Sequence, residues 1–82
     1  MSTVINDDQA REYVAANVAR LRGDRSRYWL AKAVGTGTIS ISRIERGEHL
    51  PGAGLLSRLA EALGVSIDTL LENPNRKSKK TA

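Results

Sequence analysis

The sequence predicts an all-α fold, a single small domain of five short helices within 82 residues. Apolar residues recur at helical spacing in several segments, and residues that cap or end helices stand between them. The one segment with strand-like alternation, residues 35–47, would have no partner strand. We expect the folded domain to span residues 1–74. Residues 75–82 form a basic tail that we expect to be disordered, as a linker or solvated end rather than an arm that binds a polyanion.

The first helix is predicted over residues 7–22. Ala10, Val14, Val18 and Leu21 recur every three or four residues, which is the spacing of one buried helix face. Asn6 is a suitable N-cap residue, and acidic residues follow it where the helix dipole favours negative charge. Glycine 23 and the aspartate after it are expected to end this helix.

A short second helix is predicted over residues 27–34, "RYWLAKAV". Ser26 can cap its beginning, and Gly35 stands where a left-handed residue commonly ends a helix. A tight turn over residues 35–37 follows.

The segment "GTGTISISRIERG" begins with the alternation of a half-buried strand. As a strand it would place Arg43 on the face of Ile39 and Ile41, and Ile44 on the opposite face. As a helix it places Ile41 and Ile44 about 60° apart on one apolar stripe. We therefore predict a third helix after the turn.

Two further helices are predicted over residues 55–63 and 67–73. The loop "EHLPGAG" precedes the first of them, Gly64 ends it, and Pro74 stops the second. The residues expected in the core are Val18, Leu21, Leu30, Val34, Ile41, Ile44, Leu56, Leu59, Leu63 and Leu70.

Composition argues against several classes of protein. The chain has no cysteine, no secretory signal and no run of about 20 apolar residues, so we expect a soluble cytoplasmic protein without membrane contact. His49 has no second metal ligand nearby, and no nucleophile, base and orienting residue form a recognisable set. No phosphate-cradling glycine motif is present. We expect no catalysis, metal, cofactor or small-molecule ligand.

Charge is concentrated in the middle of the chain. Residues 20–46 hold seven arginines and lysines against two acidic residues, whereas residues 1–75 as a whole carry nine of each sign. This distribution predicts one basic face that meets a polyanion.

The predicted third helix has a side that the core does not need. It carries Thr38, Ile39, Ser42, Arg43 and Arg46. Thr, Ile and Ser are poor choices for exposed helix positions, so helix stability does not explain them. Arginine can pair with guanine, hydroxyls can donate or accept, and isoleucine can meet a thymine methyl group. This face is suited to reading double-stranded DNA in the major groove.

The helix over residues 27–34, the turn and the third helix together form a helix-turn-helix motif. The exposed amides near Ser26 and Arg27 are a natural site for a DNA phosphate. Trp29 could stack on a base but is expected to pack, and Tyr28 could either bond a phosphate or pack.

Residues 14–72 resemble the phage repressor and Cro-like helix-turn-helix family. The resemblance rests on "VARLR", "LAKAVGTGTISISRIERG", a proline four residues later and "LLSRLAEALGVSIDTLL". It implies a compact five-helix domain of the lambda-repressor type that binds operator DNA, usually as a two-fold dimer on a palindromic site. It also implies dimer contacts through the helix over residues 67–73 and the connection before it, where Val65, Ile67, Leu70 and Leu71 are apolar.

The resemblance assigns roles by position. The base-contacting residues would be Thr38, Ile39, Ser42 and Arg43. The residues near phosphates would be Ser26, Arg27, Gly37, Ser40 and Arg46. A structural ion pair would join Glu45 to Arg22, or to Arg20 if the alignment has no gap; the pattern of "VARLR" favours Arg22.

Two functions from different classes remain. The first is a sequence-specific transcriptional regulator, expected to be a repressor that binds a palindromic operator as a homodimer. The alternative is a protein-interaction module, such as an antitoxin or regulatory subunit, that grips a partner through the last two predicted helices.

Overall fold

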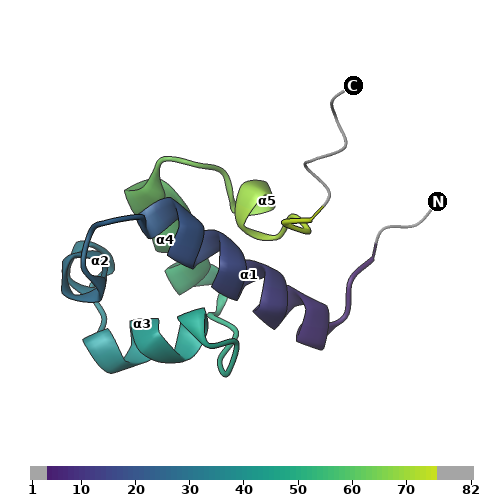
Figure 1. The fold of residues 1–82 in the computed structure, drawn as a ribbon, viewed down its shortest axis with the longest axis horizontal. Helices are drawn as coiled ribbons and strands as arrows, with labels where there is room; N and C mark the ends of the chain where they lie inside the picture. The colour runs from purple at the N-terminus through teal and green to yellow at the C-terminus, as the bar shows by residue number, and fades with distance from the viewer. Residues whose placement is uncertain (1–3, 76–82) are drawn as a thin grey trace.

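The computed structural model describes residues 4–75, which fold into five helices. They are α1 (Asp7–Arg22), α2 (Arg27–Val34), α3 (Thr38–Glu45), α4 (Ala53–Leu63) and α5 (Ile67–Leu70) (Figure 1). No strand occurs among these described residues. The prediction of an all-α, five-helix fold is confirmed. Residues 76–82, and with them nearly all of the predicted tail, lie outside the described residues.

The helix boundaries follow from local hydrogen bonds. The Asn6 side chain accepts from the Gln9 N–H (2.8 Å), and the Gln9 side chain accepts from the Asn6 N–H (3.1 Å), which makes a capping box before α1. The Ser26 hydroxyl accepts from the N–H of Trp29 (2.9 Å) before α2. Ser66 caps α5 in the same way. These caps satisfy amides that the helices leave unpaired, and α1 and α2 have the predicted bounds.

The last two helices differ from the prediction at one end each. Helix α4 begins two residues early because the N–H of Leu56 already donates to the carbonyl of Gly52 (2.8 Å), which closes a helical turn there. Helix α5 ends at Leu70 instead of residue 73. The N–H of Glu72 donates three residues back, to the Thr69 carbonyl (3.3 Å), so the α-helical pattern is already lost there. Pro74 in turn disfavours a helical conformation at residue 73.

All five helices contribute to one aliphatic core. Its buried members are Val14, Val18, Leu30, Ala31, Val34, Ile41, Ile44, Leu59, Ala60 and Leu70. Three residues expected in the core, Leu21, Leu56 and Leu63, are only partly buried and pack against its edge. The core instead includes Val14, Ala31 and Ala60, which were not among the residues expected there.

One polar side chain lies inside this core. Asn17 on α1 is 1% exposed, and its amide nitrogen lies 3.2 Å from the Thr69 carbonyl and 2.9 Å from the carbonyls of Leu70 and Glu72. Its amide oxygen accepts from Arg20 (3.2 Å). Asn17 therefore supplies a side-chain donor to carbonyls at the end of α5, of which, within residues 4–75, only that of Thr69 also accepts from a backbone N–H, that of Glu72 (3.3 Å).

Helix α1 connects the two halves of the molecule. It packs against α3, α4 and α5, while α2 packs against α3 and α4. In Figure 1, α3 lies on one side of α1 and α5 on the other. The outer face of α3 is thus far from the last helix. None of the helices in residues 4–75 is long and apolar enough to cross a membrane.

Candidate nucleic-acid interface

Three residues join α2 to α3. Gly35 ends α2 in the left-handed conformation (φ 75°), and its N–H donates to the last turn of that helix. This value of φ is unfavourable for a residue with a Cβ atom. Gly37 begins α3 in an extended conformation without a side-chain cap. The short link makes α2, the turn and α3 a helix-turn-helix unit, as predicted.

Helix α3 has two distinct faces. Ile41 and Ile44 are fully buried, whereas Ile39 on the same helix is 70% exposed. A buried position for every isoleucine would be expected if α3 served only to complete the core. An exposed isoleucine instead places an apolar side chain on the outer surface of the motif.

The four predicted base-contacting residues share this outer side of α3. Thr38, Ile39 and Arg43 are exposed, and Ser42 is partly exposed. The Arg43 side chain forms no hydrogen bond or ion pair with any of residues 4–75. The surface thus offers hydroxyl, methyl and guanidinium groups, which match the groups on base edges in a major groove.

The five residues predicted near phosphates differ in exposure and in whether they already form hydrogen bonds within the protein. Gly37 is exposed at the start of α3, Ser40 is partly exposed, and the Ser26 oxygen already caps α2. Arg46 donates to Glu48 at 3.0 and 3.3 Å. Arg27 donates through Nε to Glu45 (3.0 Å). Both arginines are therefore engaged by carboxylates, which the sequence did not indicate.

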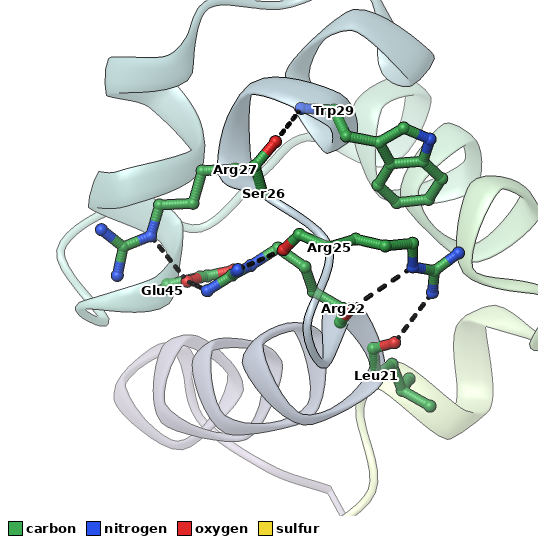
Figure 2. A network of polar contacts seen from close by, with 7 residues as sticks. All are labelled: Leu21, Arg22, Arg25, Ser26, Arg27, Trp29 and Glu45. Atoms are coloured by element: carbon green, nitrogen blue, oxygen red, sulfur yellow. Dashed lines mark hydrogen bonds and ion pairs between the residues drawn. The ribbon is translucent and has the colours of Figure 1, made fainter.

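The carboxylate of Glu45 joins three helices at the end of α3. Arg22, the last residue of α1, donates to it through Nε (2.6 Å) and Nη2 (2.9 Å), and Arg27 adds a third contact (Figure 2). The Glu45 side chain is 2% exposed and that of Arg22 is 17% exposed. Arg20, the other partner that the sequence allowed, contacts Asn17 instead. The structure thus brings together the pair that the resemblance favoured.

Opposing effects act on the pKa of Glu45. Burial raises it more than any other single cause, but the hydrogen bonds from Arg22 and Arg27, together with their positive charges, outweigh burial and leave the pKa below its ordinary value. The same contact raises the pKa of Arg22. Glu45 is therefore ionised at neutral pH despite being buried.

This lowered pKa predicts acid-sensitive stability. A carboxylate with a lower pKa in the folded chain stabilises the fold fully above its unfolded pKa of about 4.5, and the contribution is lost as the pH falls through the folded value. Urea unfolding of the wild type should therefore show a falling midpoint on acidification below that pH. Glu45→Gln should lower stability at neutral pH and flatten this dependence. An equally steep fall in the variant would contradict the assignment.

The connection between α1 and α2 is held by Arg25, which the sequence analysis did not single out. Its guanidinium donates to the carbonyls of Leu21 (3.0 Å) and Arg22 (3.3 Å), and lies 4.1 Å from the ring centre of Trp29 (Figure 2). Arg22 in turn donates to the Arg25 carbonyl (2.6 Å). A basic residue just past a helix end was the available signal.

The aromatic residues and the histidine lie as follows. Trp29 is partly buried against the core, in agreement with the packing role expected for it. Tyr28 is 63% exposed, and the Lys32 amine lies 5.7 Å from its ring centre. His49 is exposed in the loop after α3. Within residues 4–75, no three acidic or histidine side chains gather in a way that could hold a metal ion.

Comparisons with known proteins agree with this geometry. A family model described as helix-turn-helix matches residues 19–70, more than half of the chain. The structure is similar to the crystal structure of a hypothetical transcription factor, NHTF, from Neisseria, with a TM-score of 0.79 and 25% sequence identity over 96% of this chain and 93% of that chain. Among curated proteins, none matches the sequence significantly. The chain belongs to the phage repressor and Cro-like helix-turn-helix family of DNA-binding domains.

Proposed function

We propose that the protein is a transcriptional repressor that binds a palindromic operator as a homodimer, with α3 in the major groove. Family membership supports DNA binding and transcriptional regulation, and the structurally similar Neisseria protein is described as a hypothetical transcription factor. The observation that carries the proposal is the outer face of α3, where Ile39 is 70% exposed beside Arg43. These groups are suited to base edges rather than to the core.

The proposed dimer would use the end of the molecule that contains α5. Leu70 is fully buried and so is not available for this contact, although the family resemblance placed it at the expected dimer surface. Ile67 is 36% exposed, and Val65 and Leu71 are partly exposed. Helix α3 lies on the other side of α1 (Figure 1), so pairing through α5 would leave its reading face uncovered.

Selection of bound sites from a random DNA pool tests the specificity of binding and the symmetry of the dimer. Two half-sites related by two-fold symmetry are the expected result, because a symmetric dimer imposes its symmetry on the operator. A single asymmetric half-site would contradict the dimer, and failure to enrich any sequence would contradict specific reading. Repression is tested separately by placing the selected site over a reporter promoter.

The Arg43→Ala variant should bind the selected site more weakly by about 1–3 kcal/mol and lose discrimination at one base pair. The physical reason is that arginine can donate two hydrogen bonds to the edge of one guanine. Fluorescence anisotropy with the selected duplex and its single-base variants measures both effects. Lys32→Ala on α2 removes the same charge outside α3 and serves as the control for charge. Unchanged discrimination by Arg43→Ala would disprove the proposed reading face.

A second candidate function is a protein-interaction module, favoured by an open hollow of about 600 Å³ between the start of α1 and the end of α5. Its lining combines Ile5, Tyr13 and Leu71 with Asp68 and Glu72. A gel shift with random-sequence duplex at low salt distinguishes the candidates. A DNA-binding domain should retard the duplex with a Kd of about 10⁻⁴ to 10⁻⁶ M or tighter. No retardation at such concentrations would favour the interaction module.

A further inference from the structure

One buried carboxylate is shared by two arginines where α1, α2 and α3 meet. Arg22 makes two hydrogen bonds to Glu45, one to each oxygen, and Arg27 adds a third to Oε1. Because a bidentate arginine already neutralises the carboxylate, the pair is complete without Arg27. The role of Arg27 in this cluster is thus not explained by the need to compensate a buried charge.

The cluster carries a surplus positive charge. Two guanidinium groups face one carboxylate, and no other acidic side chain in residues 4–75 forms an ion pair with Arg22 or Arg27. The two arginine side chains differ in their exposure to solvent. The Arg22 side chain is 17% exposed, whereas that of Arg27 is 46% exposed. The uncompensated charge is therefore accessible at Arg27.

The contact with Glu45 also orients the Arg27 guanidinium. Its Nε faces the carboxylate, and its two terminal nitrogens point away from the cluster (Figure 2). None of the hydrogen bonds from residues 4–75 engages these two nitrogens. Because the guanidinium is planar, fixing Nε leaves two outward N–H groups with the spacing that suits two oxygens of one phosphate.

We propose that Glu45 is a positioning residue, which presents the Arg27 guanidinium to a phosphate of the DNA backbone. Glu45 does not touch DNA in this arrangement. It holds Nε so that the terminal nitrogens meet the phosphate in one orientation, and Arg22 in turn fixes Glu45. The inference rests on the proposed function and adds a reason why arginine, rather than any cation, stands at the first position of α2.

The test compares two substitutions of Arg27 in the full chain. Binding of a short random-sequence duplex is measured by fluorescence anisotropy at several salt concentrations. Arg27→Ala should flatten the slope of log K against log salt by about 0.9, because one phosphate contact is lost. Arg27→Lys should keep the slope, since the charge remains. It should nevertheless bind severalfold more weakly than the wild type at every salt concentration, because an ammonium group lacks the planar set of donors.

Arg11→Lys is the matched control. Arg11 on α1 also forms an ion pair with a carboxylate, Asp8, but it lies outside the helix-turn-helix. This variant should bind like the wild type. If Arg27→Lys also binds like the wild type, only charge matters and the inference is overturned. If the wild type itself fails to bind random duplex, the proposed function fails instead, so the two failures are distinguishable.

Glu45→Gln supplies the second arm, as a double-mutant cycle. In that background, the loss caused by Arg27→Lys should become smaller, because the positioning carboxylate is already absent. A loss of the same size would overturn the inference. Urea unfolding of each variant establishes the folded fraction before binding is compared. If Glu45→Gln does not fold, Glu45→Asp takes its place in the cycle, because it keeps the charge but withdraws the carboxylate from the Nε of Arg27.

Discussion

Glu45→Ala is expected to lower the free energy of unfolding by about 3 kcal/mol, near the lower end of the range for breaking a buried ion pair. The carboxylate is 2% exposed and accepts hydrogen bonds from the last residue of α1 and the first residue of α2. Its removal leaves the mostly buried guanidinium of Arg22 without a carboxylate to balance its charge, although the hydrogen bond to the Arg25 carbonyl remains. In a domain whose total stability is about 5–15 kcal/mol, such a loss is readily measured by urea unfolding.

Glu48→Ala is the matched control for this prediction. Glu48 also accepts two hydrogen bonds from an arginine, Arg46, but both side chains are more than half exposed. Exposed pairs contribute little because water and salt screen them. The midpoint for Glu48→Ala should stay close to that of the wild type. Similar losses for Glu45→Ala and Glu48→Ala would mean that the junction of the three helices does not depend on the buried carboxylate.

The second large effect is expected at Asn17. Asn17→Ala should lower the free energy of unfolding by about 1–3 kcal/mol for the buried Leu70 carbonyl alone, because that oxygen loses its donor. The carbonyls of Thr69 and Glu72 lose the same partner and add to the cost. Thermal and urea unfolding measure the loss.

Two related variants test the cause of this effect. Arg20→Ala removes the exposed side chain that donates to the amide oxygen of Asn17 but leaves the amide donors in place, so a small change is expected. Asn17→Asp should be more harmful than Asn17→Ala at neutral pH, because a carboxylate would face three carbonyl oxygens. Equal stability of Asn17→Asp and the wild type would exclude a role for the donated hydrogen bonds.

The sequence predicts most of the fold because its helix signals are local. Ser26 and Gly35 bound α2 by contacts within a few residues of themselves, and the break in alternation at Arg43 and Ile44 distinguishes helix from strand. The helix was predicted three residues too long at the end of α5. The spacing of Ile67, Leu70 and Leu71 indicates a buried face, but it does not show which backbone carbonyls accept hydrogen bonds. Pro74 marks only the latest possible end, whereas the N–H of Glu72 already donates three residues back, to the Thr69 carbonyl.

Contacts between elements were less accessible from the sequence. The choice between Arg20 and Arg22 as the partner of Glu45 required an alignment, because both stand near the end of the same helix. That Arg27 also reaches Glu45 depends on how α2 is placed relative to α3, which no local pattern specifies. The five residues expected near phosphates were assigned by their positions in the family pattern. Such a position does not show whether the side chain already forms a hydrogen bond or ion pair within the protein.

Asn17 did leave a signal in the sequence. It stands three residues after Val14 and seven after Ala10, so helical spacing places it on the same face as these two buried residues. A polar residue on an apolar face requires hydrogen-bond partners inside the protein. The identity of those partners, 52 to 55 residues away along the chain, could come only from the structure.

The hydrogen bonds of Asn17 also bear on how small this domain can be made. Helix α5 has four residues, too few to persist without tertiary support, and Asn17 supplies part of that support from α1. Yet Asn17, Val14 and Val18 precede residue 19, where the match to the family model begins. The matched segment therefore lacks residues that pack in the core of this chain. Truncation at the edge of the match would remove the residues that hold the final helix.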